Sequence, residues 1–165
     1  QIQFFDDLED TLEGFRGLKL SSSGGQTRTM TLSFKHGGES NQEEATASYT
    51  LGELSDGQRA LVVLYALIRF TLQEDVTLCI DEPGNYLGLT EIQPWLLEAQ
   101  NVCQDNKAQT LLVSHHPELI DFLASEQGIL FSRANAGPVR TGPVEASEEG
   151  AIAISDLMAR GWLNE

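Results

Sequence analysis

Two acidic residues follow a short apolar run, where they could bind a metal ion and activate water. Asp81 and Glu82 come directly after Val76–Ile80. A buried strand of an α/β protein delivers the residues after it to the carboxyl edge of the sheet, where such proteins place ligands. One carboxylate there can hold Mg²⁺, which prefers oxygen ligands, and the next can polarise an attacking water. The alternative is an acidic pair on an exposed turn, and the pair alone does not decide.

A histidine follows the next apolar run, Thr110–Val113. In a parallel sheet His115 would emerge at the same edge as Asp81. It could donate to a phosphate oxygen or position the attacking water, and the alternative is a capping or core histidine. We expect His116 and Pro117 to begin the following helix. Adjacent histidines without Cys or acid at ligand spacing do not predict a zinc site.

The segment Leu54–Arg59 opens a longer apolar run and carries a third candidate site. Ser55 is placed to cap a helix beginning near Asp56, and Gly57 leaves the backbone open to close approach. The free N–H groups of a helix N-terminus can bind phosphate. The alternative is an ordinary capped helix with a glycine near its start.

Hydrophobic patterning predicts the elements that position these residues. Residues 76–80 and 110–113 lack alternation, which is typical of central parallel strands covered on both faces. Residues 60–70 are apolar almost all round and predict a buried helix. Residues 90–102 predict a helix between the two strands, with Pro94 in its first turn. Helices and strands in succession predict an α/β sheet with right-handed crossovers.

The flanking segments predict smaller elements around this sheet. Alternation in Met30–Phe34 and Ala45–Leu51 predicts a β-hairpin with a long polar loop. The chain thus divides into a helix end with a hairpin (1–53), a core lobe (54–133), and a loop with a C-terminal helix (134–165). The remaining expectations are a helix end at 1–15, a turn or flexible loop at 21–25, a helix after Pro117, a strand at 129–131, an exposed loop at 134–150 and a helix at 151–162.

Composition limits the protein class. The chain has 165 residues, with 10 basic and 25 acidic residues and a net charge of −15. That average field repels a phosphate backbone, so we expect no nucleic-acid clamp in this piece by itself. Cys79 and Cys103 have no metal-ligand spacing and predict reduced thiols of an intracellular protein. No apolar run approaches the roughly 18 residues of a membrane span, so we expect a soluble, cytoplasmic chain without membrane contact.

In this order, the motifs resemble those of the ABC-class ATPases, a P-loop NTPase family. The nearest branch is SMC/RecF/Rad50-like, which includes AAA-family ATP-binding proteins of the OLD-like and anti-phage type. Leu54–Gln58 resembles the ABC signature, and Val76–Glu82 the Walker B strand with its catalytic glutamate. Gly84–Leu89 occupies the D-loop position and His115 the switch-histidine position. The resemblance covers most of Tyr49–Leu123.

The resemblance implies a mechanism in which two heads sandwich two ATP molecules. Asp81 would support Mg²⁺, Glu82 would be the general base, and His115 would contact the γ-phosphate. The signature would reach the γ-phosphate of the ATP held by the opposite head, and the D-loop would couple the two sites. ATP binding would close this dimer and hydrolysis would open it. The signature and D-loop residues implied are Ser55, Gly57, Gln58 and Asn85 to Leu87.

The chain departs from this family pattern in three ways. It has no G-x-x-x-x-G-K-[ST] phosphate loop, the Walker A motif, so we expect it to bind ATP weakly or not at all by itself. Asp56 replaces the usual signature glycine and places a negative charge near a polyphosphate. Gly84–Leu87 differs from the corresponding sequence of transporter subunits, which argues against transport.

Our leading hypothesis is the C-terminal half of an ABC-type ATPase whose Walker A lobe lies upstream in the full-length protein. The resemblance implies DNA repair or phage defence as its setting, and DNA or an effector nuclease as partners through other regions. The alternative is a non-catalytic interaction or regulatory module for a nuclease or toxin. Retention of Glu82 and His115 favours the enzyme. An ordinary α/β domain with coincidental motifs is the third interpretation.

Overall fold

The computed structural model describes residues 2–22, 24–25, 27–36, 45–144 and 153–160. The protein forms two compact units, residues 1–111 and 112–165. Their positions relative to one another are not determined, so each unit is described by itself. The boundary falls inside the segment 54–133 that we expected to form the core lobe.

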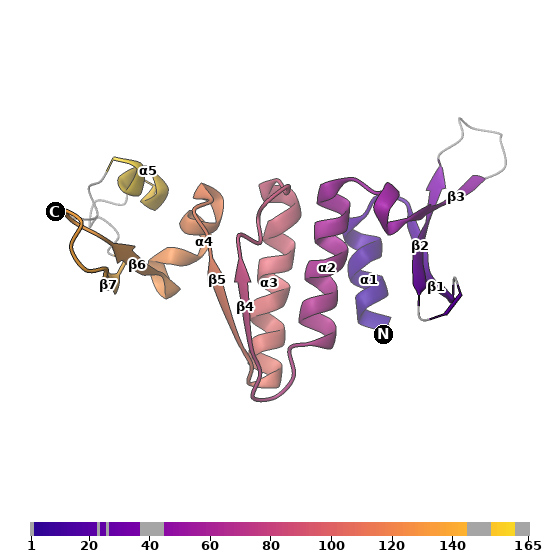
Figure 1. The fold of residues 1–165 in the computed structure, drawn as a ribbon, viewed down its shortest axis with the longest axis horizontal. Coiled ribbons are helices and arrows are strands. Elements are labelled where there is room, and N and C mark those ends of the chain that lie inside the picture. Colours follow the sequence, from indigo (N-terminus) through magenta and orange to yellow (C-terminus); the bar gives the residue numbers. More distant parts are fainter. Residues whose placement is uncertain (1, 23, 26, 37–44, 145–152, 161–165) are drawn as a thin grey trace. The chain divides into compact units, whose positions relative to one another are not determined.

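The first unit combines helices and strands (Figure 1). Its elements, in chain order, are α1 (Ile2–Thr11), β1 (Phe15–Ser22), β2 (Arg28–His36), β3 (Ala45–Thr50), the short 3₁₀ helix η1 (Leu51–Glu53), α2 (Asp56–Phe70), β4 (Thr77–Asp81), α3 (Leu89–Asn106) and the start of β5 (Gln109–Val113).

Strands β1, β2 and β3 form an antiparallel sheet in that order. The predicted hairpin of β2 and β3 is confirmed, and its connecting loop lies outside the described residues. Strand β1 was not predicted. It pairs with β2 from Phe15 opposite Phe34 to Ser22 opposite Arg28, with a bulge after Phe15. The apolar face of the sheet buries Phe15, Leu32 and Phe34.

Helices α1, α2 and α3 pack side by side and form the core of this unit (Figure 1). A partly buried ion-pair network ties them together: the guanidinium of Arg69 on α2 binds the carboxylates of Asp7 on α1 and Glu98 on α3. Helix α2 is not buried all round as expected, because Val63 and Phe70 are about half exposed. The buried side chains are Phe4, Leu8, Leu12, Leu61, Val62, Leu64, Tyr65, Ile68, Leu72, Ile92, Trp95, Leu96, Ala99 and Val102.

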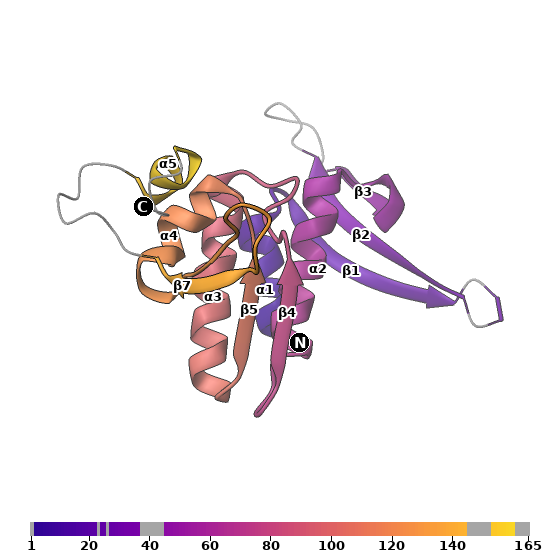
Figure 2. The ribbon, with the colours of Figure 1, turned by 60° about the vertical axis from the view of Figure 1, so that its left-hand side comes forward.

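Strands β4 and β5 form a two-stranded sheet. Gln109, the first residue of β5, donates its N–H to the carbonyl of Val76, just before β4, at 2.9 Å. Both strands therefore begin at the same end and run parallel (Figure 2). The half-buried face lies towards α3, where Cys103 Sγ is 3.1 Å from Thr110 Oγ1.

The expectation that both faces of this sheet are covered was wrong. Burial alternates along β4, and Thr77, Cys79 and Asp81 are exposed. Leu111 of β5 is also 47% exposed. Helix α3 packs against one face, and the exposed side chains of the two strands lie on the other face. Cys79 and Cys103 are free thiols, as expected.

The predicted helix between the strands is confirmed as α3, but the expected position of its proline was wrong. Pro94 is the sixth residue of α3 and lies beyond the first turn. A proline there has no N–H for the carbonyl of Thr90, four residues earlier. The helix tolerates this loss because Pro94 is on its exposed side.

The second unit contains α4 (Pro117–Gln127), β6 (Ile129–Ser132), β7 (Arg140–Pro143) and α5 (Ile154–Ala159). The predicted helix after His116 and strand near residue 129 are confirmed. The expectation of a loop throughout 134–150 was wrong, because β7 pairs antiparallel with β6. Residues 145–150 of that segment lie outside the described residues. In the described part of the chain, no helix is long and apolar enough to cross a membrane.

Candidate functional site

The acidic pair stands at the end of β4, as predicted. Asp81 is the last residue of the strand and is exposed, whereas Glu82 is half-buried. The backbone of Glu82 has φ of 51°, in the left-handed region that side chains other than glycine rarely adopt. The chain therefore turns sharply at Glu82, directly after the strand end.

Two consecutive turns follow this pair and form the predicted D-loop. The N–H of Asn85 donates to the carbonyl of Glu82 at 3.2 Å, and the N–H of Leu87 donates to the carbonyl of Gly84 at 3.1 Å. Leu87 is buried and anchors the loop, whereas Tyr86 is 75% exposed and has φ of 70°. The loop thus presents Asn85 and Tyr86 to solvent from a fixed base.

The predicted signature begins helix α2, and its cap explains where that helix starts. Ser55 is the N-cap: its Oγ accepts the N–H of Gln58 at 3.2 Å, and Gln58 Oε1 accepts the N–H of Ser55 at 3.1 Å. This reciprocal capping box fixes both side chains at the helix end. The amides of Asp56 and Gly57 precede the first intrahelical bond, from Arg59 N–H to the carbonyl of Ser55.

The negative charge of Asp56 has a partner within the same turn. Its carboxylate pairs with the guanidinium of Arg59, three residues later, and both side chains are exposed. The pairing of Arg59 with Asp56 was not predicted, although the spacing of three residues could have revealed it. The pair offsets the charge that Asp56 would otherwise present to a polyphosphate.

The predicted signature and the predicted D-loop touch through backbone. A β-carbon added at Gly57 would lie 2.9 Å from the carbonyl oxygen of Tyr86 and 3.6 Å from Leu87 Cδ2. Only glycine permits this approach, because any side chain would collide with the carbonyl. The predicted phosphate-binding helix end and the loop that follows Glu82 therefore form one packed surface.

A cleft of about 540 Å³ adjoins the signature. It lies between helix α2 and the antiparallel sheet. On its sheet side the ring centroids of Phe34 and Tyr49 are 6.0 Å apart. The pKa of the Glu53 carboxyl at its rim is lowered by hydrogen bonds from the backbone and the hydroxyl of Thr50. The lining residues are Glu13, Gly14, Phe34, Lys35, Tyr49, Glu53, Leu54 and Gln58.

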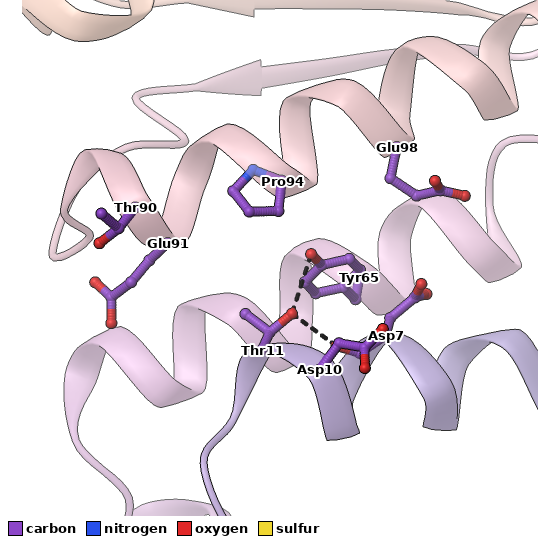
Figure 3. A pocket seen from close by; sticks show the side chains of 8 residues that line it. All are labelled: Asp7, Asp10, Thr11, Tyr65, Thr90, Glu91, Pro94 and Glu98. Carbon is purple, nitrogen blue, oxygen red and sulfur yellow. Dashed lines mark hydrogen bonds between the residues drawn. The ribbon is translucent and has the colours of Figure 1, made fainter.

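A second cleft, of about 390 Å³, lies between α1, α2 and α3 and is rich in acidic side chains (Figure 3). Tyr65 reaches into it, with Thr11 Oγ1 3.2 Å from its hydroxyl. No group of three His, Cys, Asp or Glu side chains among the described residues is arranged to hold a metal ion. The lining residues are Asp7, Asp10, Thr11, Tyr65, Thr90, Glu91, Pro94 and Glu98.

His115 belongs to the second unit. It is exposed and follows β5, and His116 is the N-cap of α4 with Pro117 at the first helical position, as predicted. The N–H of His116 donates to Ser114 Oγ at 3.0 Å, and His116 Nδ1 lies 3.8 Å from Glu118 Oε2. Asp81 and Glu82 belong to the first unit, so the expectation that His115 lies at the same edge of the sheet stays a prediction.

Comparison with known proteins gives one finding. A family model described as "AAA domain, putative AbiEii toxin, Type IV TA system" matches residues 6–121, more than half of the chain. No curated protein matches. The match spans the predicted signature, the acidic pair and His115, and indicates a P-loop NTPase-type domain with nucleotide-binding, ATPase-like function. The chain therefore belongs to the family of AAA domains that this description names.

Proposed function

We propose that this chain is the signature-bearing half of an ATP hydrolase of the ABC type, which acts at the interface of two such heads. The observation that supports it best is the contact between Gly57 and the Tyr86 carbonyl, because it packs the signature against the loop that carries Glu82. An ordinary capped helix has no need of this approach.

The acidic pair has the chemistry of a magnesium site that the substrate completes. Mg²⁺ is usually held by one or two protein carboxylates together with phosphate oxygens and water. Asp81 is exposed at the strand end, so its carboxylate is open to a Mg²⁺ ion that also binds phosphate and water. No closed cage of protein ligands occurs among the described residues. Glu82, held by its turn, would accept the proton of the attacking water, and His115 would contact the γ-phosphate.

The start of α2 would serve the nucleotide of the opposite head. The amides of Asp56 and Gly57 lie at the positive end of a 15-residue helix, where phosphate is favoured. The Ser55 hydroxyl and the Gln58 amide, fixed by the capping box, would add hydrogen bonds to the same phosphate. Asn85 would contact the opposite head from the exposed tip of the D-loop.

The proposed enzyme needs a second lobe that carries the phosphate loop. The open face of β4 supports this requirement, because parallel strands are usually covered on both faces. Cys79 and Leu111 expose their side chains on this face. A covering lobe with the Walker A motif would bury them and cradle the nucleotide, so the isolated chain should not turn over ATP.

The test measures ATP binding and turnover by the longer protein that carries this chain and its Walker A lobe. Glu82→Gln should lower turnover at least about 100-fold while ATP still binds, because only proton acceptance is lost. Glu126→Gln, an exposed carboxylate on α4, is the matched control and should change turnover less than about twofold. Unchanged turnover in Glu82→Gln would refute the catalytic role and favour the interaction module.

A further inference from the structure

The positive charge of this acidic protein is concentrated in one hairpin. Residues 15–36 contain four of the ten basic residues and none of the 25 acidic ones. The hairpin therefore has a net charge of +4, and the rest of the chain one of −19. The four residues are Arg16, Lys19, Arg28 and Lys35. We call the two strands β1 and β2 with their turn the basic ribbon.

The outer half of the basic ribbon projects away from the helices (Figure 2). The side chains from Lys19 to Ser22 and that of Arg28 are exposed, and that of Thr29 is half-buried. In the turn, a β-carbon added at Gly24 or Gly25 would meet no atom within 4 Å. No other part of the described chain therefore packs against the turn at Gly24 and Gly25.

The register places one cation on each face of the ribbon. Lys19 lies opposite Thr31, and Ser22 lies opposite Arg28. Because successive side chains of a strand point to opposite faces, Lys19 and Arg28 are on different faces. Lys19 shares its face with hydroxyl groups: Ser21, Thr29 and Thr31. A lysine among hydroxyl donors on an exposed strand is suited to phosphate oxygens.

We propose that the outer half of the basic ribbon inserts into the major groove of duplex DNA. That groove is about 12 Å wide and admits a two-stranded β-ribbon. Phosphates line both of its walls, so a ribbon with Lys19 on one face and Arg28 on the other contacts both strands. The deep, narrow major groove of duplex RNA does not admit such side chains. The contacts are to the backbone, so binding is independent of sequence.

The remaining basic residues contribute less. Arg16 is held by Glu9 at 3.0 Å, close to the body of the unit. Lys35 lies at the inner end of β2, beside the cleft that adjoins the signature. Lys19 and Arg28 thus account for about two phosphate contacts. Each contact makes the plot of log association constant against log[salt] more negative in slope by about 0.9.

The net charge of −15 does not prevent this contact. A strand rises about 3.3 Å per residue, so the eight residues of β1 span about 23 Å. At 0.1 M salt the Debye length is about 10 Å, and charges beyond it are largely screened. The ribbon therefore presents its cations to DNA ahead of the acidic body.

The test measures fluorescence anisotropy of a labelled 20-base-pair duplex of arbitrary sequence, titrated with the intact 165-residue chain between 50 and 200 mM salt. Lys19→Gln/Arg28→Gln should weaken binding at 50 mM salt at least about tenfold and make the salt slope shallower by about 2. The matched control is Lys107→Gln/Arg140→Gln, which removes the same charge from exposed positions off the ribbon. It should weaken binding less than about threefold.

Three results would overturn the proposal. The first is an equal loss of DNA affinity in both double variants, and the second is the absence of saturable DNA binding at 50 mM salt. The third is ribbon-dependent binding to phosphatidylserine vesicles without binding to the duplex. The last would assign the ribbon to a membrane surface. Circular dichroism should show both double variants folded, because all four side chains are exposed. The assay contains no ATP, so its outcome is independent of the ATPase proposal.

Discussion

The Gly57 α-carbon faces the Tyr86 carbonyl oxygen so closely that a β-carbon on Gly57 would lie 2.9 Å from it. Gly57 lies in the predicted signature, and Tyr86 lies in the predicted D-loop. Their contact makes the start of α2 and the end of the Glu82 turn one rigid surface. A change at either residue must therefore move the other.

Gly57→Ala should destabilise the protein by about 1–3 kcal/mol, because the added methyl group overlaps a backbone carbonyl that cannot rotate away. Helix propensity alone predicts the opposite sign, since alanine favours a helix by about 1 kcal/mol over glycine. Urea unfolding measures the change. The control is Gly52→Ala, where an added β-carbon meets no atom within 4 Å. An equal effect at both positions would contradict the close contact.

Glu82 should carry a backbone cost that glycine relieves. Its φ of 51° costs about 1–2 kcal/mol for a residue with a β-carbon. Glu82→Gly and Glu82→Ala both remove the carboxylate, but only glycine accepts this φ freely. We expect the glycine variant to be the more stable by about 1 kcal/mol in urea unfolding, although both should lose catalysis. A more stable alanine variant would show that the turn is not strained.

Arg69 should be the most sensitive charged residue of the three-helix core. Its guanidinium binds Asp7 through Nε at 2.6 Å and Nη2 at 2.8 Å, and also binds Glu98. The hydrogen bonds that Arg69 donates to Asp7 raise the pKa of its guanidinium. Arg69→Ala leaves two carboxylates without a cation and should cost about 3 kcal/mol.

Two variants separate this network from charge loss in general. Arg69→Lys keeps the charge but loses the planar fork, so its cost should fall between those of wild type and Arg69→Ala. Arg16→Ala removes the exposed pair with Glu9, which should contribute less than about 1 kcal/mol. Chemical unfolding of all three variants ranks the costs. Equal costs for Arg16→Ala and Arg69→Ala would exclude a special role for the network.

The signals that the sequence carries locally were confirmed by the structure. The Ser55 cap, the helix that starts at Asp56 and the helix that starts at Pro117 depend on residues within one turn of each other. The acidic pair also stands at a strand end, as expected. Each of these features follows from short-range hydrogen bonding or from a short apolar run.

Features that depend on distant partners were missed. Strand β1 has only Leu18 and Leu20 as alternating apolar residues, so its pairing with β2 determines its structure. The open face of β4 could not be inferred from its apolar run, because exposure depends on what packs against the strand. The approach of Gly57 to Tyr86 joins residues that tertiary structure alone brings together. Local patterns therefore predicted the elements better than their surroundings.

Tyr65 should make the protein less stable in alkaline solution. Its side chain is buried, and desolvation raises its pKa above the ordinary value of 10.0, because burial disfavours the phenolate. The unfolded chain then releases this proton at a lower pH than the folded protein does. The stabilisation is fully present below about pH 10 and is lost as the pH rises through the folded-state pKa.

Urea unfolding at several pH values between 8 and 11 tests this linkage. Tyr65→Phe keeps the ring and removes the titrating group, so its stability should fall less steeply above pH 10 than that of wild type. The variant should be somewhat less stable at pH 8, because the contact between the Tyr65 hydroxyl and Thr11 Oγ1 is lost. Tyr86→Phe, at a 75% exposed position, is the control and should keep the wild-type slope. If the stability of wild type and of Tyr65→Phe fell in parallel above pH 10, Tyr65 would ionise equally well in the folded and the unfolded protein. Burial between α1 and α3 would then not exclude the phenolate.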